Sequence, residues 1–155
     1  MAGRFITFEG IDGSGKSTQS RLLAAAIDAV LTREPGGTAI GSRVRELVLG
    51  LDTVDLSPRA EALLMAADRA QHVQEHIRPA LEAGHWVLSD RFSGSTAAYQ
   101  GYGRGLSLPL IEQLSLIACR GLQPDLTLLL DVPLAESLRR RGHRLADRIE
   151  ATYLA

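Results

Sequence analysis

One glycine-rich segment has the residue types and the spacing of a phosphate-binding loop. Residues 10–17 read Gly-Ile-Asp-Gly-Ser-Gly-Lys-Ser and match the pattern G-x-x-x-x-G-K-[ST] in full. In such a loop, glycines let backbone N–H groups approach phosphate oxygens, a lysine reaches the β and γ oxygens, and a hydroxyl binds Mg²⁺. Lys16 is the single lysine of a chain that has sixteen arginines. We therefore predict a nucleotide site formed by Gly10, Asp12, Gly13, Ser14, Gly15, Lys16, Ser17 and Thr18.

Asp12 lies inside this loop although its charge has the wrong sign for a residue that faces a triphosphate. We expect its carboxylate to face away from the phosphates, toward a metal-bound water or a second substrate. The alternative is that Asp12 only tightens the turn.

The segments around the loop predict the elements that must position it. Apolar, β-rich stretches at 5–9, 30–32, 86–88 and 126–132 indicate strands, and the last is apolar enough to be buried on both faces. Helical patterns cover 17–26, 40–49, a long stretch from Ser57-Pro58 toward Gly84 that Pro79 could bend, 95–100 and 108–119. Trp86 is expected in the core. Strands that alternate with helices predict an α/β fold, a doubly wound parallel sheet with helices on both faces.

Length, charge and cysteine content exclude several classes of protein. The 155 residues suit a single domain, and a net charge of −1 gives no general attraction to nucleic acid or to an anionic membrane. Cys119 is alone, so no disulfide can form within the chain. With neither a signal peptide nor a membrane-spanning apolar run in the sequence, we expect a cytoplasmic protein.

Phosphate-binding loops serve GTPases, large ATPases and small-molecule kinases. A GTPase would need an Asn-Lys-x-Asp motif for guanine, which is absent because Lys16 is the only lysine. A large ATPase would need a longer chain. The sequence therefore favours a small-molecule kinase.

Further motifs follow the loop in a distinctive order. They are Phe-Glu-Gly-Ile-Asp-Gly-Ser-Gly-Lys-Ser-Thr at 8–18, Thr-Arg-Glu-Pro-Gly-Gly-Thr at 32–38, Ala-Ala-Asp-Arg-Ala at 66–70, Ser-Asp-Arg-Phe at 89–92 and Asp-Arg-Ile-Glu at 147–150. With these motifs the sequence resembles the bacterial thymidylate kinases over nearly its whole length. The resemblance implies a P-loop kinase that uses ATP and Mg²⁺ to phosphorylate thymidine monophosphate (dTMP), giving dTDP and ADP, and that forms a homodimer.

A phosphate acceptor is already nucleophilic, so its kinase needs counter-charge and alignment rather than a base. Arg33, Arg45, Arg69 and Arg91 lie in or beside the motifs and could supply that charge. By the resemblance, Arg45 and Arg91 would hold the acceptor phosphate. Asp90 would act near Mg²⁺, through its water shell or by orienting Arg91, and Ser17 would bind the metal. Glu9 either supports the same region or only caps a helix.

The resemblance also implies how the base and the sugar are read. Arg69 would donate to a thymine carbonyl, Thr96 would contact the pyrimidine edge, and Tyr99 would crowd the sugar C2′ position. Met65 stands where the family usually has a stacking Phe, while Ser95 and Gln100 would either bind or only brace the loop. The predicted dTMP site is Asp12, Arg33, Pro35, Arg45, Met65, Arg69, Arg91, Ser95, Thr96, Tyr99 and Gln100.

A catalytic arginine is expected from a lid at about 139–150. One branch of the family has an Arg inside the loop where this chain has Gly13, so that charge must come from elsewhere. The candidates are Arg141, Arg144 and Arg148, and the sequence does not choose among them. With Lys16, Asp12, Asp90 and Arg91 they complete the predicted catalytic set, and the lid should close over ATP.

Two alternatives stay open at this point, another P-loop nucleoside monophosphate kinase and a nucleotide-binding module without turnover. The family's fifth strand and closing helix have no counterpart in the sequence. We therefore expect that these residues are part of a longer polypeptide.

Overall fold

A parallel sheet forms the centre of the molecule. The computed structural model describes residues 3–53, 55–142 and 147–154. Its strands are β1 (Phe5–Glu9), β2 (Val30–Arg33), β3 (Val87–Asp90) and β4 (Leu126–Leu129), and they lie in the order β2-β3-β1-β4. Every neighbouring pair is parallel. All four strands lie close to their predicted positions, and the predicted fold class is confirmed.

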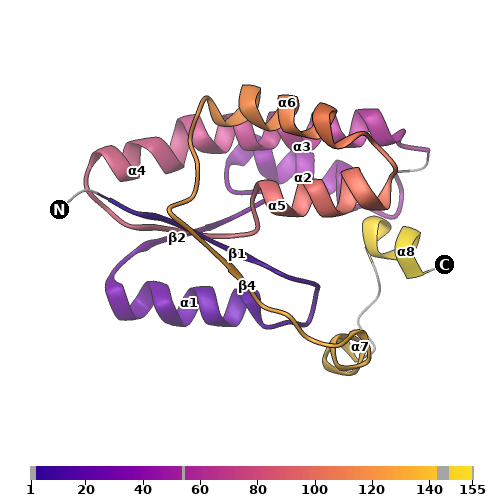
Figure 1. Ribbon diagram of the computed structural model, residues 1–155, viewed down its shortest axis with the longest axis horizontal. Coiled ribbons are helices and arrows are strands. Elements are labelled where there is room, and N and C mark those ends of the chain that lie inside the picture. The colour runs from indigo at the N-terminus through magenta and orange to yellow at the C-terminus, as the bar shows by residue number, and fades with distance from the viewer. Residues whose placement is uncertain (1–2, 54, 143–146, 155) are drawn as a thin grey trace.

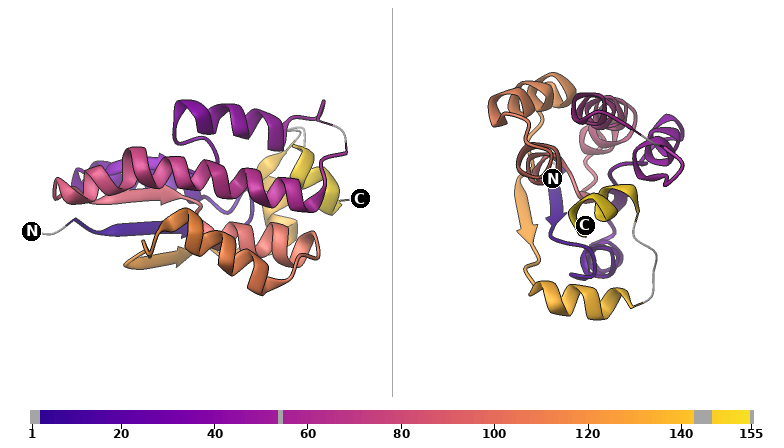
Figure 2. Two further views of the ribbon diagram at one scale, coloured as in Figure 1. Left: turned by 90° about the horizontal axis from the view of Figure 1, so that it is seen from above. Right: turned by 90° about the vertical axis from the view of Figure 1, so that its right-hand side faces the viewer.

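Helices cover both faces of this sheet, as expected. Figure 1 shows α1 on one face and α3 to α6 on the other, and the right-hand view of Figure 2 shows the same helical layers on either side of the strands. The helical elements are α1 (Lys16–Ile27), α2 (Ala39–Leu49), α3 (Pro58–His72), η1 (Val73–Ile77), α4 (Arg78–Glu82), α5 (Ser93–Thr96), η2 (Ala97–Gly103), α6 (Leu108–Cys119), α7 (Leu134–Arg141) and α8 (Arg148–Leu154). The lid that the sequence predicts at about 139–150 overlaps the end of α7 and the start of α8, two helices that the sequence did not predict.

Alternating side chains of β1 supply two core layers. Phe5 packs with residues of η1 and α6, whereas Ile6 and Phe8 pack with Ala24 of α1. This alternation follows from the period of two in a strand. It fixes β1 between both helical layers and so fixes the start of the loop that follows it.

The long helical stretch after Ser57 changes its hydrogen-bond register once. Ser57 caps α3 by accepting from the Ala60 amide, as its sequence position predicts. The π-helical turn η1 then precedes Pro79, which has no N–H to donate. No helix among the described residues is long and apolar enough to cross a membrane.

Two burial predictions are wrong. β4 was expected to be buried on both faces, yet Leu126 is 49% exposed and Leu129 is 71% exposed. Trp86 was expected in the core and is 40% exposed. β4 is an edge strand that pairs with β1 alone among the described strands, and burial depends on such neighbours rather than on the strand's own apolar residues.

Candidate active site

The phosphate loop connects β1 to α1 and depends on its glycines. Gly10 has φ of 142°, and a Cβ there would lie 2.4 Å from the Leu130 carbonyl oxygen. Gly13 has φ of 80°, and its Cβ would lie 2.7 Å from the Ser137 carbonyl oxygen in α7. Neither position can carry a side chain without moving backbone. Other strands and helices therefore enclose the loop closely.

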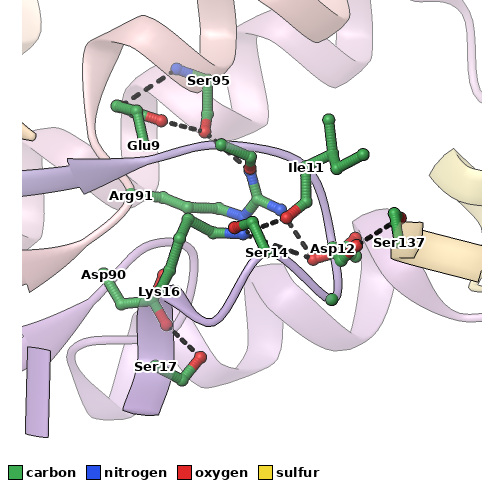
Figure 3. Close-up of polar contacts among 12 residues, drawn as sticks. Glu9, Ile11, Asp12, Ser14, Lys16, Ser17, Asp90, Arg91, Ser95 and Ser137 are labelled. Atoms are coloured by element: carbon green, nitrogen blue, oxygen red, sulfur yellow. Dashed lines mark hydrogen bonds and ion pairs between the residues drawn. The ribbon is translucent and has the colours of Figure 1, made fainter. Parts of the chain in front are cut away.

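Lys16 folds back over this loop. Its side chain is 5% exposed, and Nζ donates to the Ile11 carbonyl oxygen at 2.8 Å and lies 3.8 Å from Asp12 Oδ1 (Figure 3). Burial, with repulsion from Arg91, lowers the pKa of Lys16 to about 8. The buried Ser14 hydroxyl has no hydrogen-bond partner among the described residues. An ammonium group and a free hydroxyl are thus available to a phosphate.

Oxygen ligands for a metal ion occur beside the loop. The Ser17 hydroxyl donates to Asp90 Oδ2, so the two predicted metal-binding residues are in contact (Figure 3). Hydroxyl and carboxylate oxygens are the ligands that Mg²⁺ prefers. Asp12, Asp147 and Glu150 form a second acidic group, with one oxygen from each within 4.8 Å of the others.

Arg91 joins the loop to the other half of the site. It follows β3 with φ of 73°, a conformation that is uncommon for residues other than glycine and that clusters at functional sites. Its guanidinium donates to Asp12 Oδ1 at 2.7 Å, to Ser95 Oγ at 3.0 Å and to the Gly10 carbonyl oxygen at 3.2 Å. Burial alone would raise the pKa of Asp12, but the neighbouring Arg91 guanidinium lowers this pKa to about 2. Asp12 therefore faces Arg91 as an ionised carboxylate.

Glu9 supports the turn that carries Arg91. Its carboxylate is buried at the end of β1 and accepts from the amides of Phe92 and Ser95 and from the Ser95 hydroxyl at 2.6 Å. These contacts bind the start of α5 to β1 (Figure 3). These contacts are compatible with both alternatives for Glu9, since they reach the first amides of α5 and also Ser95, which accepts from Arg91.

A small cavity of about 80 Å³ gathers most of the predicted acceptor residues. Burial, with repulsion from Arg33, lowers the pKa of Arg45, whose Nη1 donates to the Pro35 carbonyl oxygen at 2.9 Å. α8 contributes the buried Ile149 and Glu150 to its lining. Predicted residues that line it are Asp12, Pro35, Arg45, Met65, Arg91, Ser95, Tyr99 and Gln100, and those that the sequence reading missed are Glu34, Leu49, Asp147, Ile149 and Glu150. The motif at 147–150 was the one signal that could have revealed the last three.

Three predicted acceptor residues lie outside that lining. Arg69 and Thr96 are both buried, and Arg69 Nη2 donates to Thr96 Oγ1 at 2.9 Å. Arg33 is exposed and lines a different cavity, together with Ser17 and Asp90.

A buried ionic network holds Arg69, and the sequence reading missed it. Glu34 Oε2 accepts from Arg69 Nε at 2.8 Å, and Glu34 Oε1 pairs with His72 Nδ1 at 2.9 Å. His72 Nε2 in turn lies 2.6 Å from the Thr32 hydroxyl. Glu34 belongs to the motif at 32–38, but nothing in its spacing predicts His72 as a partner.

The lid arginines take different positions. Arg141 lies against the loop, with its Cγ 3.4 Å from the Cβ position of Gly13, and its Nη2 donates to Glu150 at 2.9 Å. Arg148 instead donates to Glu61 Oε2 at 2.6 Å and to the Val48 carbonyl oxygen at 3.0 Å. Arg144 lies outside the described residues. Of the two described candidates, only Arg141 is beside the phosphate loop.

Arg140, which was not a candidate, also reaches the loop. Its Nη1 lies 3.3 Å from the Gly13 carbonyl oxygen and 3.5 Å from that of Ser14. Three consecutive arginines at 139–141 gave no signal for which of them faces the phosphates.

Comparison with known proteins yields one family. The family model described as Thymidylate kinase matches residues 8–153. The thymidylate kinases of Parasynechococcus marenigrum (strain WH8102) and Prochlorococcus marinus (strain MIT 9313) are 59% and 60% identical, over 97% of this chain and 78% and 75% of theirs. The crystal structure of thymidylate kinase from Ehrlichia chaffeensis matches with a TM-score of 0.81 at 39% identity, over 99% of this chain and 80% of that chain.

Proposed function

Because the chain belongs to the thymidylate kinase family, we propose that it transfers the γ-phosphate of ATP to dTMP and releases dTDP and ADP. One observation carries this proposal most directly. The acceptor-side Arg91 is hydrogen-bonded to the donor loop itself, at Asp12 and at the Gly10 carbonyl oxygen. A phosphate held by Arg91 would therefore lie beside a triphosphate bound in that loop, as direct transfer requires.

The charges around the site fit transfer between two phosphates. The acceptor phosphate supplies its own nucleophilic oxygen, so the protein has to align it and offset negative charge. Arg45 and Arg91 would bind it, which would relieve the repulsion that Arg45 experiences from Arg33. Lys16 and Arg141 would offset charge on the transferred group. Asp12 would orient Arg91 rather than touch the triphosphate.

Glu34, Arg69, Thr96 and Gln100 form what we call the base-binding wall, and their donors and acceptors fit a pyrimidine with a protonated N3. Arg69 is a donor suited to a carbonyl oxygen, and its contact with Thr96 holds the two predicted base-reading groups together. Gln100 lines the cavity, and its Oε1 has no hydrogen-bond partner among the described residues. Thymine offers both a carbonyl oxygen and an N3–H, whereas cytosine has no proton on N3. We assign the N3–H of thymine to Gln100 Oε1.

Sugar selection would come from Tyr99. The Arg91 guanidinium lies 5.2 Å from the centre of the Tyr99 ring, so this ring is beside the proposed acceptor phosphate. A ring at that position would restrict space next to C2′ and favour deoxyribose. Met65, which is 5% exposed, would pack against the base through its flexible thioether.

Ser17 and Asp90 would hold Mg²⁺, Asp90 through a water molecule. Their contact places two hard oxygen ligands next to the loop, which fits this ion. When bound, Mg²⁺ supplies positive charge to the β and γ phosphates.

We further propose a homodimer that acts in the cytoplasm and binds ATP and dTMP but neither nucleic acid nor membrane. Leu116 and Ile117 on α6 are 53% and 74% exposed, and such apolar side chains favour contact with a second copy. The lone Cys119 suits a reducing compartment, and the net charge of −1 suits a protein without polyanionic partners.

A panel of acceptors tests the function. The purified protein is given ATP and Mg²⁺ with dTMP, AMP or CMP, and ADP release is measured. We expect the highest kcat/KM with dTMP. A preference for AMP or CMP would overturn the assignment, and ATP binding without transfer to any acceptor would indicate a module without turnover.

A further inference from the structure

A carboxylate buried next to Gln100 has no place in the mechanism described so far. Glu61 of α3 is 1% exposed, and its Oε1 accepts from Gln100 Nε2 at 2.8 Å. Burying a charged group is costly unless other groups compensate for it. Arg148 Nη2 contacts Glu61 Oε2 at 2.6 Å, and Arg104 Nε lies 3.6 Å from the same oxygen. These two guanidinium groups balance the charge of Glu61.

The chemistry of Glu61 determines which way the Gln100 amide faces. An ionised carboxylate only accepts hydrogen bonds, so the amide must turn its NH₂ group toward Glu61. The opposite orientation would bring two acceptors together and leave the NH₂ group without its partner. With Nε2 facing Glu61, the amide oxygen is left for the cavity, and Oε1 is the buried atom without a partner.

We propose that Glu61 is a positioning residue for base selection. By fixing Gln100 Oε1 as an acceptor at the cavity, it selects bases that carry a proton on N3 and rejects bases whose N3 is itself an acceptor. The proposal rests on the proposed function and adds to it the group that sets discrimination between dTMP and dCMP. Glu61 itself touches no substrate and acts through Gln100.

The test is the isosteric substitution Glu61→Gln. A glutamine can donate or accept, so it permits Gln100 to turn and present its NH₂ group to the N3 of cytosine. We expect kcat/KM for dTMP to fall about tenfold, mainly through KM, and the dCMP-to-dTMP ratio of kcat/KM to rise about tenfold, the effect of one mispaired buried group. The KM for ATP should stay the same.

The chain offers a matched control on the same helical stretch. Gln71 Nε2 donates to Glu75 Oε2 at 2.7 Å, an exposed pair of the same two residue types. Glu75→Gln should leave the dCMP-to-dTMP ratio unchanged. An unchanged ratio in folded Glu61→Gln would overturn the inference, because a merely structural role for Glu61 would lower both activities together.

Two further measurements keep the outcomes distinct. If circular dichroism shows that Glu61→Gln is not folded, Gln100→Met decides: loss of dTMP activity with dCMP activity kept supports the inference, and equal loss of both contradicts it. The wild-type panel is measured first. A wild type that does not prefer dTMP contradicts the proposed function, whereas wild-type preference with an unchanged ratio in Glu61→Gln contradicts only the role of Glu61.

Discussion

In the proposed function, the donor loop and the base-binding wall recognise their ligands by different means. The donor loop is one run of eight residues, 10–17, whose shape follows from glycines and whose phosphate-binding groups are largely backbone amides. The wall is built from buried side chains of separate elements, in which Glu34 accepts from Arg69 and Gln100 is held by Glu61. Any triphosphate satisfies the first arrangement. Only a base with matching donors and acceptors satisfies the second.

This difference implies that the two regions fail differently when they are altered. Loss of a group from the donor loop should reduce turnover with every acceptor. Loss of a group from the wall should change which acceptor is used, because a buried polar atom left without its partner penalises one ligand more than another.

Lys16→Ala should have the largest effect. It removes the one ammonium group at the loop, and kcat should fall by about 10²–10³-fold or more with every acceptor. The fold should persist, because the hydrogen bond to the Ile11 carbonyl oxygen is the only one that Lys16 donates among the described residues. ADP release measures kcat, and thermal melting measures whether the fold persists. The exposed Arg21 of α1 gives the control Arg21→Ala, and near-normal turnover in Lys16→Ala would remove the loop from the mechanism.

Arg91→Ala should affect the acceptor more than the donor. It removes a cation assigned to the acceptor phosphate, so kcat/KM for dTMP should fall about 100-fold while the KM for ATP changes little. The kcat/KM for dTMP and the KM for ATP are obtained from initial rates in which each substrate is varied in turn. Arg59→Ala, at an exposed position of α3, is the control. A variant in which only the KM for ATP changes would contradict the acceptor role of Arg91. It would also contradict the expected difference between the donor loop and the acceptor side of the site.

Substitutions of the two described lid arginines should differ in the same way, one lowering turnover and the other weakening use of the acceptor. Arg141 lies against the loop, so Arg141→Ala should lower kcat about tenfold. Arg148 contacts Glu61, so Arg148→Ala should raise the KM for dTMP about fivefold with a smaller change in kcat. Steady-state kinetics of both variants provide the measurement. The reverse pattern would place the catalytic charge on Arg148.

Asp68→Asn should give the smallest effect, in stability. Asp68 is buried and accepts from the Gly36 amide at 3.0 Å, and burial together with Glu34 raises its pKa to about 6 from 3.8. The folded state therefore holds a proton that the unfolded chain has lost, and the free energy of unfolding falls as pH rises from 4 to 6. Asn does not titrate, so the variant should gain about 1–3 kcal/mol relative to the wild type over that range.

Urea unfolding at pH 4 and at pH 7 measures this shift. Asp52→Asn, at an exposed position, should show none. The same stability difference at both pH values would show that the folded protein binds no more protons at Asp68 than the unfolded chain does, and would contradict the raised pKa.

Much of the donor side could be read from the sequence because its information is local. Gly10 to Thr18 follow one another along the chain, and the strand before them and the helix after them are indicated by residue periodicity. Parallel strands that alternate with helices then place Asp90 and Arg91 at the same sheet edge as the loop, which is where the structure has them.

Only the tertiary structure decided which side chains meet across long separations. Arg69 pairs with Glu34 and Gln100 with Glu61, 35 and 39 residues apart, and Arg148 reaches Glu61 over 87 residues. Periodicity predicts which face of an element is buried but not which partner faces it. The same reason explains why β4 is exposed, since a strand's burial is set by the neighbours that packing brings to it. The sequence alone determined the phosphate loop and the order of elements, and packing determined the groups around the base.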